Sequence, residues 1–388
     1  MNNYGFTEEQ IMIRELANQI ADEKIRPVRA QLDEKGEFPQ DIIQVIAESD
    51  LFRIFVREEY GGLGGGCLDL CIVTEELSKA CAGIAVSYAA SALGTLPLEL
   101  FGSEEQKKKY MPDIAAGTKL AAFGLTEPNA GSDAGRIETT ARKEGNEYIL
   151  NGSKIFITNG GVADIYTVIA MTNKEKGARG ASAFVVEKGT KGFDFGKEEE
   201  KMGIRSSATR ELVFDECRIP AENLIAREGK GFIVAMRTFD HSRPGIGAQA
   251  VGIAQGALDE AIAYSTGRIQ FGQPVSSFQA IRHMIADMAT KIEAARNLVY
   301  QAARVVDSGA KDASKFSAMS KLFASDVAME VTVNAVQIFG GYGFMKEYPA
   351  EKYMRDAKIT QIYEGTNQIQ RDVIGLEVIK ESKQRHRK

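Results

Sequence analysis

The spacing of apolar residues divides the chain into three regions. From Thr7 to about Gly117, apolar side chains such as Ile42, Ile46 and Ala47 recur every three to four residues, which predicts helices. The first helix follows Thr7-Glu8-Glu9-Gln10, which has the form of a capping box. In such a box a hydroxyl and an amide pair with the free N–H groups of the first turn.

From about Leu120 to Leu224 the pattern changes to short β runs. Tyr148 to Leu150 and Ser153 to Thr158 flank Asn151-Gly152, a pair that supplies the positive φ angles of a type I′ turn, so we expect a hairpin there. Further β runs cover 166–170, 183–186 and 212–214. Because these runs do not alternate with helical segments, they predict an antiparallel sandwich or barrel.

After Gly229 the helical period returns and persists. The segments 249–266, 279–308 and 311–339 are long, periodic and bounded by breaks, as in a helical bundle. We therefore expect an α+β protein that is mostly α. Its predicted parts are an N-terminal helical domain over residues 1–120, a central antiparallel β domain over 121–228 and a C-terminal helical bundle over 229–388.

Composition narrows the classes of function. The chain has 388 residues, against about 150 for a typical domain, and 44% of them are apolar, enough for several cores. A net charge of −5 argues against a nucleic-acid partner, which usually needs a basic face. Residues 80–98 carry no charge and nearly reach the length of a membrane span, but their Ala, Ser, Gly and Thr content favours a buried helix. We expect no membrane insertion.

The start of the chain shows neither a basic segment nor an apolar segment of the kind found in secretory signals. We therefore expect a cytoplasmic protein, or a protein of the mitochondrial matrix if a transit peptide has been removed. The four cysteines fit no metal-binding spacing and the three histidines are far apart, so we expect no metal.

One glycine motif imitates a dinucleotide site. Gly245-Ile-Gly247-Ala-Gln-Ala250 has the spacing of the Rossmann fingerprint, but Arg243-Pro244 precedes it where a buried strand is needed. Close packing between helices explains its small residues better than a nicotinamide site does.

Short polar and glycine-rich segments stand at the joints between the regions, at residues 123–135, 268–274, 337–343 and 362–371. The first offers the hydroxyls of Thr126 and Ser132 and the backbone N–H groups of a turning loop, which can hold a polar ring edge or a pyrophosphate. In the second, Arg268 can grip a phosphate with two N–H groups. The glycines of the third segment would let a ligand approach the backbone closely.

Together the four segments resemble the acyl-CoA dehydrogenase family of flavoproteins, in the same order and over essentially the whole chain. The most specific part is Arg355-Asp356-Ala357-Lys358 ahead of Ile362-Tyr363-Glu364-Gly365-Thr366. The resemblance implies an N-terminal helical domain, a central β domain and a C-terminal four-helix bundle, with FAD as cofactor. It implies the α,β-dehydrogenation of an acyl-CoA thioester, with electrons passed to electron-transfer flavoprotein.

The resemblance also implies roles for individual residues. Glu364 matches the family's usual catalytic base, which takes the α-proton. Positions that match contacts with the isoalloxazine ring are Phe123, Leu125, Thr126, Gly131, Ser132, Phe156, Ile157 and Thr158. Phe156 stands where many relatives have Trp. Further cofactor positions are Arg268, Phe271, Gln279, Gln337, Gly340, Gly341, Thr366 and Gln368.

Among these, Arg268, Gln279 and the segment 337–341 reach the FAD of a neighbouring subunit in the family, which implies a homo-oligomer, usually a tetramer. Positions that match contacts with the substrate are Ser132, Asp240, Arg243 and Gly365. Some relatives carry the base on the preceding helix, at the position of Ser242 here. Because serine is not a base, the sequence offers no alternative to Glu364 as the catalytic base at that position.

The substrate is the least determined feature. The run Tyr88-Ala89-Ala90-Ser91-Ala92-Leu93 should set pocket depth, and its small residues leave room for a short, branched or alicyclic acyl group. A short chain is the first choice. The alternatives are an acyl-CoA oxidase that uses oxygen, a flavin monooxygenase on this fold, and a non-catalytic family scaffold, which an intact Glu364 argues against.

Overall fold

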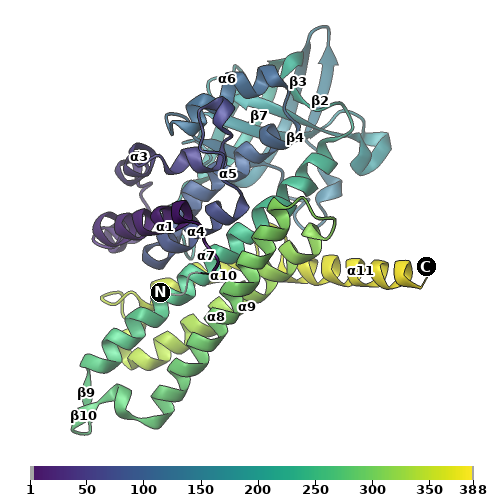
Figure 1. The fold of residues 1–388 in the computed structure, drawn as a ribbon. Helices are drawn as coiled ribbons and strands as arrows, with labels where there is room; N and C mark the ends of the chain where they lie inside the picture. Colours follow the sequence, from purple (N-terminus) through teal and green to yellow (C-terminus); the bar gives the residue numbers. More distant parts are fainter. Residues whose placement is uncertain (1–3, 387–388) are drawn as a thin grey trace.

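The computed structural model describes residues 4–386. Helices of the N-terminal part and a β sheet lie together at one end of the molecule, and a bundle of long helices extends from them (Figure 1). The first part contains α1 (Glu8–Ile20), α2 (Arg29–Lys35), α3 (Gln40–Glu48), α4 (Cys67–Ala80), α5 (Ala82–Phe101) and α6 (Glu104–Ala115). The predicted capping box is formed, since Thr7 and Gln10 each bond the other's backbone N–H at 3.2 Å.

Helix α5 is the apolar helix that the sequence singles out. By length and composition alone, α5 and the segment Ala313–Phe344 pass as membrane spans, but 67% of the α5 window is buried inside the protein. The backbone of α5 packs closely on the sheet, because a Cβ at Gly94 would lie 2.5 Å from the amide nitrogen of Ala122. The helix therefore serves as a core element between helices and sheet.

The sheet is built from β1 (Ala121–Gly124), β2 (Thr140–Glu144), β3 (Glu147–Thr158), β4 (Ile165–Met171), β5 (Ala181–Glu187), β6 (Phe193–Glu198), β7 (Thr209–Pro220) and β8 (Leu224–Ile225). Its strand order is β6-β7-β3-β2-β4-β5-β8, with β1 paired to β4. The expected antiparallel arrangement holds for most pairs. The exceptions are β1 with β4 and one pair of β2 with β4, which are parallel because long crossovers separate these strands in the sequence.

The predicted hairpin at Asn151-Gly152 is wrong. The turn lies between β2 and β3, where Glu144 pairs with Glu147, and Asn151-Gly152 lies inside β3 at a shift in register with β7. Pairing with β7 decides the outcome: the Asn151 side chain bonds Glu216 twice, each at 2.8 Å. A Cβ at Gly152 would lie 2.7 Å from Oγ1 of Thr139, so glycine serves a bulge rather than a turn.

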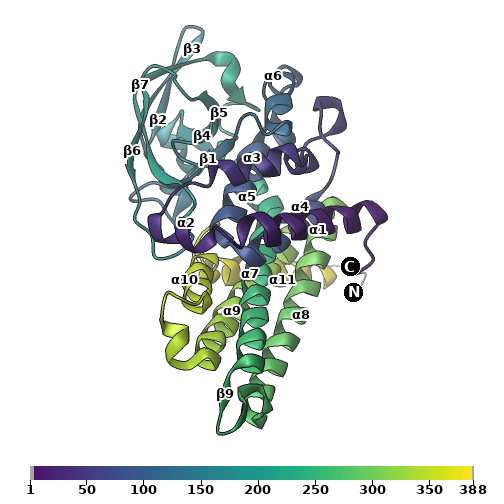
Figure 2. The same cartoon turned by 90° about the vertical axis from the view of Figure 1, so that its left-hand side faces the viewer.

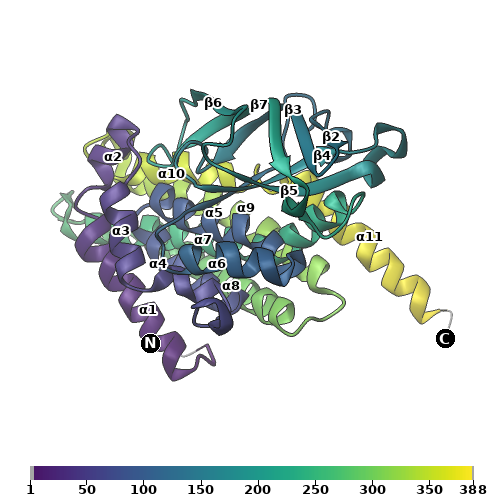
Figure 3. The same ribbon diagram turned by 90° about the horizontal axis from the view of Figure 1, so that it is seen from above.

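The C-terminal part contains α7 (Gly231–Gly267), α8 (Gln279–Asp307), α9 (Ala313–Phe339), α10 (Ala350–Thr360) and α11 (Asn367–Arg385), with a small hairpin of β9 (Ile269–Gln270) and β10 (Gln273–Pro274). Helices α7, α8 and α9 run side by side and α10 packs against α7 and α9, as in a bundle (Figure 2). Helix α11 projects away from the body, as the view from above shows (Figure 3).

Helix α7 begins well before the predicted start at Gln249 and contains Pro244. A proline has no N–H to offer the carbonyl four residues earlier, which here belongs to Asp240. The hydroxyl of Ser317 on α9 donates to that carbonyl at 2.6 Å. This bond between helices lets one uninterrupted helix run from the sheet to the far end of the bundle.

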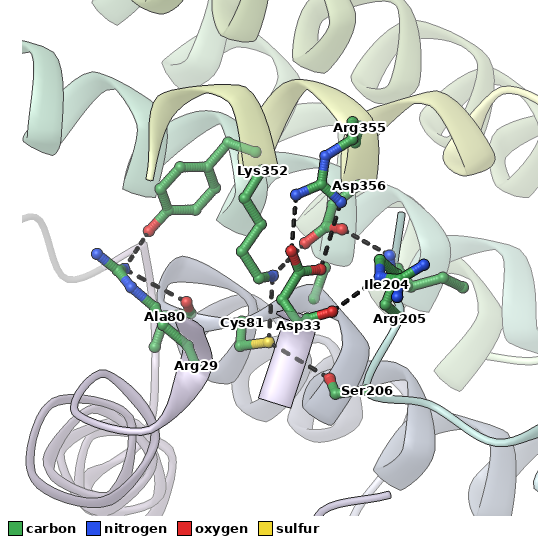
Figure 4. Close-up of polar contacts among 12 residues, drawn as sticks. Arg29, Asp33, Ala80, Cys81, Ile204, Arg205, Ser206, Lys352, Arg355 and Asp356 are labelled. Atoms are coloured by element: carbon green, nitrogen blue, oxygen red, sulfur yellow. Dashed lines mark hydrogen bonds and ion pairs between the residues drawn. The ribbon is translucent and has the colours of Figure 1, made fainter. Parts of the chain in front are cut away.

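The Arg355-Asp356 motif joins the three parts of the chain (Figure 4). The carboxylate of Asp356 accepts the backbone N–H of Ile204 at 2.6 Å and pairs with Lys352 at 2.5 Å. Arg355 pairs with Asp33 of the N-terminal part at 2.7 Å. Helix α10, which leads directly to Glu364, is therefore tied to both other regions.

We expect Asp356→Ala to lower the free energy of unfolding by about 3–5 kcal/mol, because it strands a buried ammonium group and a buried N–H group. Thermal unfolding of the purified protein measures this loss. The matched control is Glu377→Ala, which removes an exposed pair with Lys380 and should cost no more than about 1 kcal/mol. Equal losses from both variants would contradict a role for Asp356 at the junction.

Candidate active site

A cavity of about 120 Å³ lies where the three parts of the chain meet. Its walls come from α4 and α5 (Leu70, Val86, Ala89, Ala90, Leu93), from the β region (Phe123, Leu125, Thr126, Phe156, Ile157, Thr158) and from the C-terminal part (Phe239, Ser242, Gly245, Ile246, Tyr363, Glu364). Most of these side chains are apolar, and Glu364 is the one carboxylate among them.

The backbone at Glu364 adopts an unusual conformation. Glu364 has a φ of 50° and is followed by Gly365 with a φ of 92°, so a non-glycine residue sits in the left-handed region. The carbonyl of Glu364 accepts from Arg243 Nε and Gln370 Nε2, each at 3.2 Å. The carbonyl of Gly365 accepts from Lys321 Nζ and Gln370 Nε2, each at 2.8 Å. These four bonds hold the strained turn and aim the carboxylate into the cavity.

Burial in this apolar setting raises the pKa of Glu364 to about 7. The hydroxyl of Ser242 donates to Oε2 at 2.5 Å, and this bond, together with the charges of Arg243 and Lys321, lowers the pKa and limits the rise. The carboxylate is therefore poised near neutral pH, where a general base is most effective.

The structure gathers the residues that the sequence assigns to the flavin ring. Phe123, Leu125 and Thr126 form one wall, and the segment 156–158 forms the wall beside it. Phe156 has a φ of 59° and is 61% exposed, so its ring is free to cover a ligand. In the described part of the chain, the hydroxyls of Thr126 and Thr158 make no hydrogen bond. Gly131 and Ser132 lie outside the wall, on an exposed loop.

The residues assigned to the substrate lie around the cavity rather than in its wall. Arg243 is 5% exposed, lies 3.6 Å from Asp240 and bonds the backbone of Glu364, so it supports the carboxylate from behind. Gly365 belongs to the same turn. Ser132 and Asp240 do not reach the cavity, and their assignment to the substrate stays a prediction.

A second group of predicted cofactor residues lies at the other end of the bundle. Arg268 and Gly341 line a cavity of about 480 Å³ there with Tyr264 and Tyr342. Phe271, Gln279, Gln337 and Gly340 are exposed around the same end, and Phe271 is 93% exposed. Helix α7 carries Ser242 and Gly267, which a rise of 1.5 Å per residue places roughly 37 Å apart. Nearer to Glu364, Thr366 caps α11 and Gln368 is exposed.

Several lining residues escape sequence reasoning, among them Leu70, Val86, Phe239 and Ile246. Phe239, Ser242 and Ile246 share one face of α7. Their spacing of three and four residues is the sequence signal that could have placed them together. The Gly245 segment also proves to be helical. A Cβ at Gly247 would lie 2.8 Å from Val299, as the predicted helix packing requires, whereas Gly245 faces open space and widens the cavity.

Comparison with known proteins decides the family. Models of the N-terminal, middle and C-terminal domains of acyl-CoA dehydrogenases match residues 7–118, 122–217 and 229–379. The chain belongs to the acyl-CoA dehydrogenase family. As members of this family depend on FAD, FAD is the expected cofactor of this acyl-CoA dehydrogenase.

The similarity to individual members extends over nearly the full length. The short-chain specific acyl-CoA dehydrogenase of Clostridium acetobutylicum is 48% identical, over 97% of this chain and 100% of that protein. The structure of butyryl-CoA dehydrogenase from Megasphaera elsdenii is 48% identical with a TM-score of 0.94, covering 96% of this chain and 99% of that one.

A third similar chain comes from a structural study of the electron transferring flavoprotein of Acidaminococcus fermentans and flavin-based electron bifurcation. It is 52% identical with a TM-score of 0.95, and the match covers 96% of this chain and 98% of that one.

We expect Ser242→Ala to move the titration midpoint of Glu364 above the value of about 7, because it removes a donor that stabilises the charged form. Infrared difference titration of the protonated carboxyl band follows the midpoint without any turnover. Thr238→Val is the control, since Thr238 lies one turn away on α7 and bonds only the carbonyl of Val234. A midpoint that stays in place or falls in Ser242→Ala would contradict the assignment.

Proposed function

We propose that this acyl-CoA dehydrogenase acts on short-chain acyl-CoA thioesters, that Glu364 removes the α-proton and that electrons pass to electron-transfer flavoprotein. The observation that carries the proposal is the placement of one desolvated carboxylate in an apolar cavity. Family likeness adds that two close relatives are named for short-chain or butyryl substrates.

The cavity walls fit the ring of FAD. Phe123 and Phe156 offer aromatic surface, and Thr126 and Thr158 offer hydroxyls that the described chain leaves without partners. These are the groups expected around a flat ring with an apolar face and polar edges. When bound, FAD supplies the acceptor for the hydride that leaves the β-carbon.

Proton removal requires more than a base, because the α-proton of a thioester is only weakly acidic. Charge that develops on the thioester oxygen needs a preorganised donor. The backbone N–H of Glu364 bonds no acceptor within residues 4–386, so it is available beside the carboxylate that takes the proton. In its charged state Glu364 accepts the proton on one carboxylate oxygen, while Ser242 holds Oε2.

The residues that line the cavity support a short acyl chain. Ala89, Ala90 and Leu93 of α5 line it as predicted, whereas Tyr88 points away and donates to the carbonyl of Leu51 at 3.0 Å. Leu70 of α4 lines both this cavity and a neighbouring one of about 240 Å³. We therefore propose that a longer acyl chain would have to pass Leu70 to reach the second cavity.

A homo-oligomer is part of the same proposal. The flavin-ring residues and the group around Arg268 lie too far apart in one chain to hold a single FAD, so a second chain must bring its Arg268 end to the cavity. The exposed apolar side chains Leu376 and Ile379 on the projecting helix α11 offer further surface for such contacts.

We expect Glu364→Gln to keep FAD and acyl-CoA bound but to slow anaerobic bleaching of the flavin by roughly 10²–10⁴-fold, as is typical for the loss of a general base. Stopped-flow absorbance measures the rate. Adding Ser242→Glu should restore part of it, since Ser242 lies within hydrogen-bond distance of the carboxylate it would replace. Near-normal bleaching in Glu364→Gln would refute the assignment of the base.

We expect Leu70→Ala to raise kcat/KM for octanoyl-CoA relative to butyryl-CoA by at least about tenfold, because one methylene in an apolar pocket can be worth that much. The control is Leu68→Ala on the same helix, which is as buried as Leu70 but lines neither cavity. The same ratio of specificities in both variants would show that Leu70 does not limit chain length.

A further inference from the structure

Lys154 and Glu127 form a buried ion pair behind the flavin-ring walls. Their side chains are 0% and 5% exposed, and Lys154 Nζ lies 2.6 Å from Glu127 Oε1. The same ammonium group donates to the carbonyl of Leu125 at 3.1 Å. Neither side chain lines the cavity, so the pair takes no direct part in the chemistry proposed above.

The carboxylate of Glu127 organises the loop that follows β1. It accepts the backbone N–H groups of Glu138 at 2.5 Å and Thr139 at 3.0 Å. The backbone of Glu127 also pairs with that of Ala130, at 3.3 and 3.1 Å. Glu127 thus closes the loop on itself and fixes its two ends to each other.

Lys154 ties this loop to β3. The lysine stands two residues before Phe156, and the neighbouring N–H of Ile155 donates to the carbonyl of Thr126 at 2.9 Å. Leu125 and Thr126 belong to one wall, and Phe156 begins the other. The ion pair and this backbone bond are therefore polar links between the two walls.

Burial is costly for such a pair. It lowers the pKa of Lys154 to about 8 despite the opposing charge of Glu127. Well-packed apolar residues often stabilise a core as well as a buried ion pair does, so stability alone is a weak reason for it. Directional bonds to named backbone groups, by contrast, fix one geometry.

We infer that Lys154 and Glu127 are positioning residues that set the spacing of the two walls holding the flavin ring. The inference rests on the proposed function, in which these two walls bind the flavin ring of FAD. It predicts that cofactor affinity depends on the bond from Lys154 to the carbonyl of Leu125, and not only on pairing the two charges.

The test compares Lys154→Met with the double variant Lys154→Met/Glu127→Gln. The single variant strands a buried carboxylate, whereas the double variant leaves no unpaired charge and keeps one acceptor oxygen for one of the two N–H groups, of Glu138 or Thr139. We expect the dissociation constant for FAD, from titration of the apoprotein, to rise at least about tenfold in both, as expected from a lost charged hydrogen bond. The visible absorption bands of the bound flavin should lose resolution in both.

The matched control removes another buried pair, between Glu75 of α4 and Arg296 of α8, as Arg296→Met/Glu75→Gln, since the hydrogen bonds of this pair reach neither of the two walls. This variant should lose stability and keep the dissociation constant of the wild type. The inference is overturned if the double variant at Lys154 and Glu127 binds FAD as tightly as the wild type with unchanged bands. A wild-type protein that does not bind FAD would instead overturn the proposed function.

Discussion

The rest of the site depends on a carboxylate that lies in an apolar setting without a direct ion pair. Glu364 is surrounded by apolar walls and receives one hydroxyl from Ser242, and the nearest cations bond the backbone around it. A direct ion pair would lower the pKa and leave a weak base. Burial without any hydrogen-bond donor or nearby cation would raise the pKa until the carboxyl group stayed protonated. The arrangement lies between these limits.

Maintaining that balance requires contributions from all three parts of the chain. Helix α7 supplies Ser242 and Arg243, α9 supplies Lys321, and α10 carries the chain to Glu364. The bonds of Asp356 to Ile204 and of Arg355 to Asp33 fix α10 against the sheet and the N-terminal helices. The same logic applies across the cavity, where Lys154 and Glu127 link two walls. Buried polar contacts lie behind the apolar surface of the cavity.

Features of the fold and site that depend on residues close together in the sequence can be predicted from it, and features that depend on distant residues cannot. Helical periods and the capping box at Thr7 are local, and the structure confirms them. The Asn151-Gly152 turn fails because its competitor is a distant strand, β7, and the early start of α7 is missed because Ser317, far along the chain, compensates for Pro244. Glu364 is identified through its motif. Leu70 and Phe239 are not, since apolar residues on helices look alike until the packing is known.

The central claim is that Glu364 in its apolar cavity removes the α-proton, and exchange of that proton tests it most directly. An acyl-CoA analogue whose β-carbon is replaced by sulfur has no hydride to give, so exchange at the α-carbon can be followed alone. The account predicts that the FAD-loaded protein incorporates solvent deuterium there, at a rate that rises with pH through about 7, where Glu364 loses its proton. Exchange no faster than that of the free thioester, or a rate that does not change across this pH range, would contradict it.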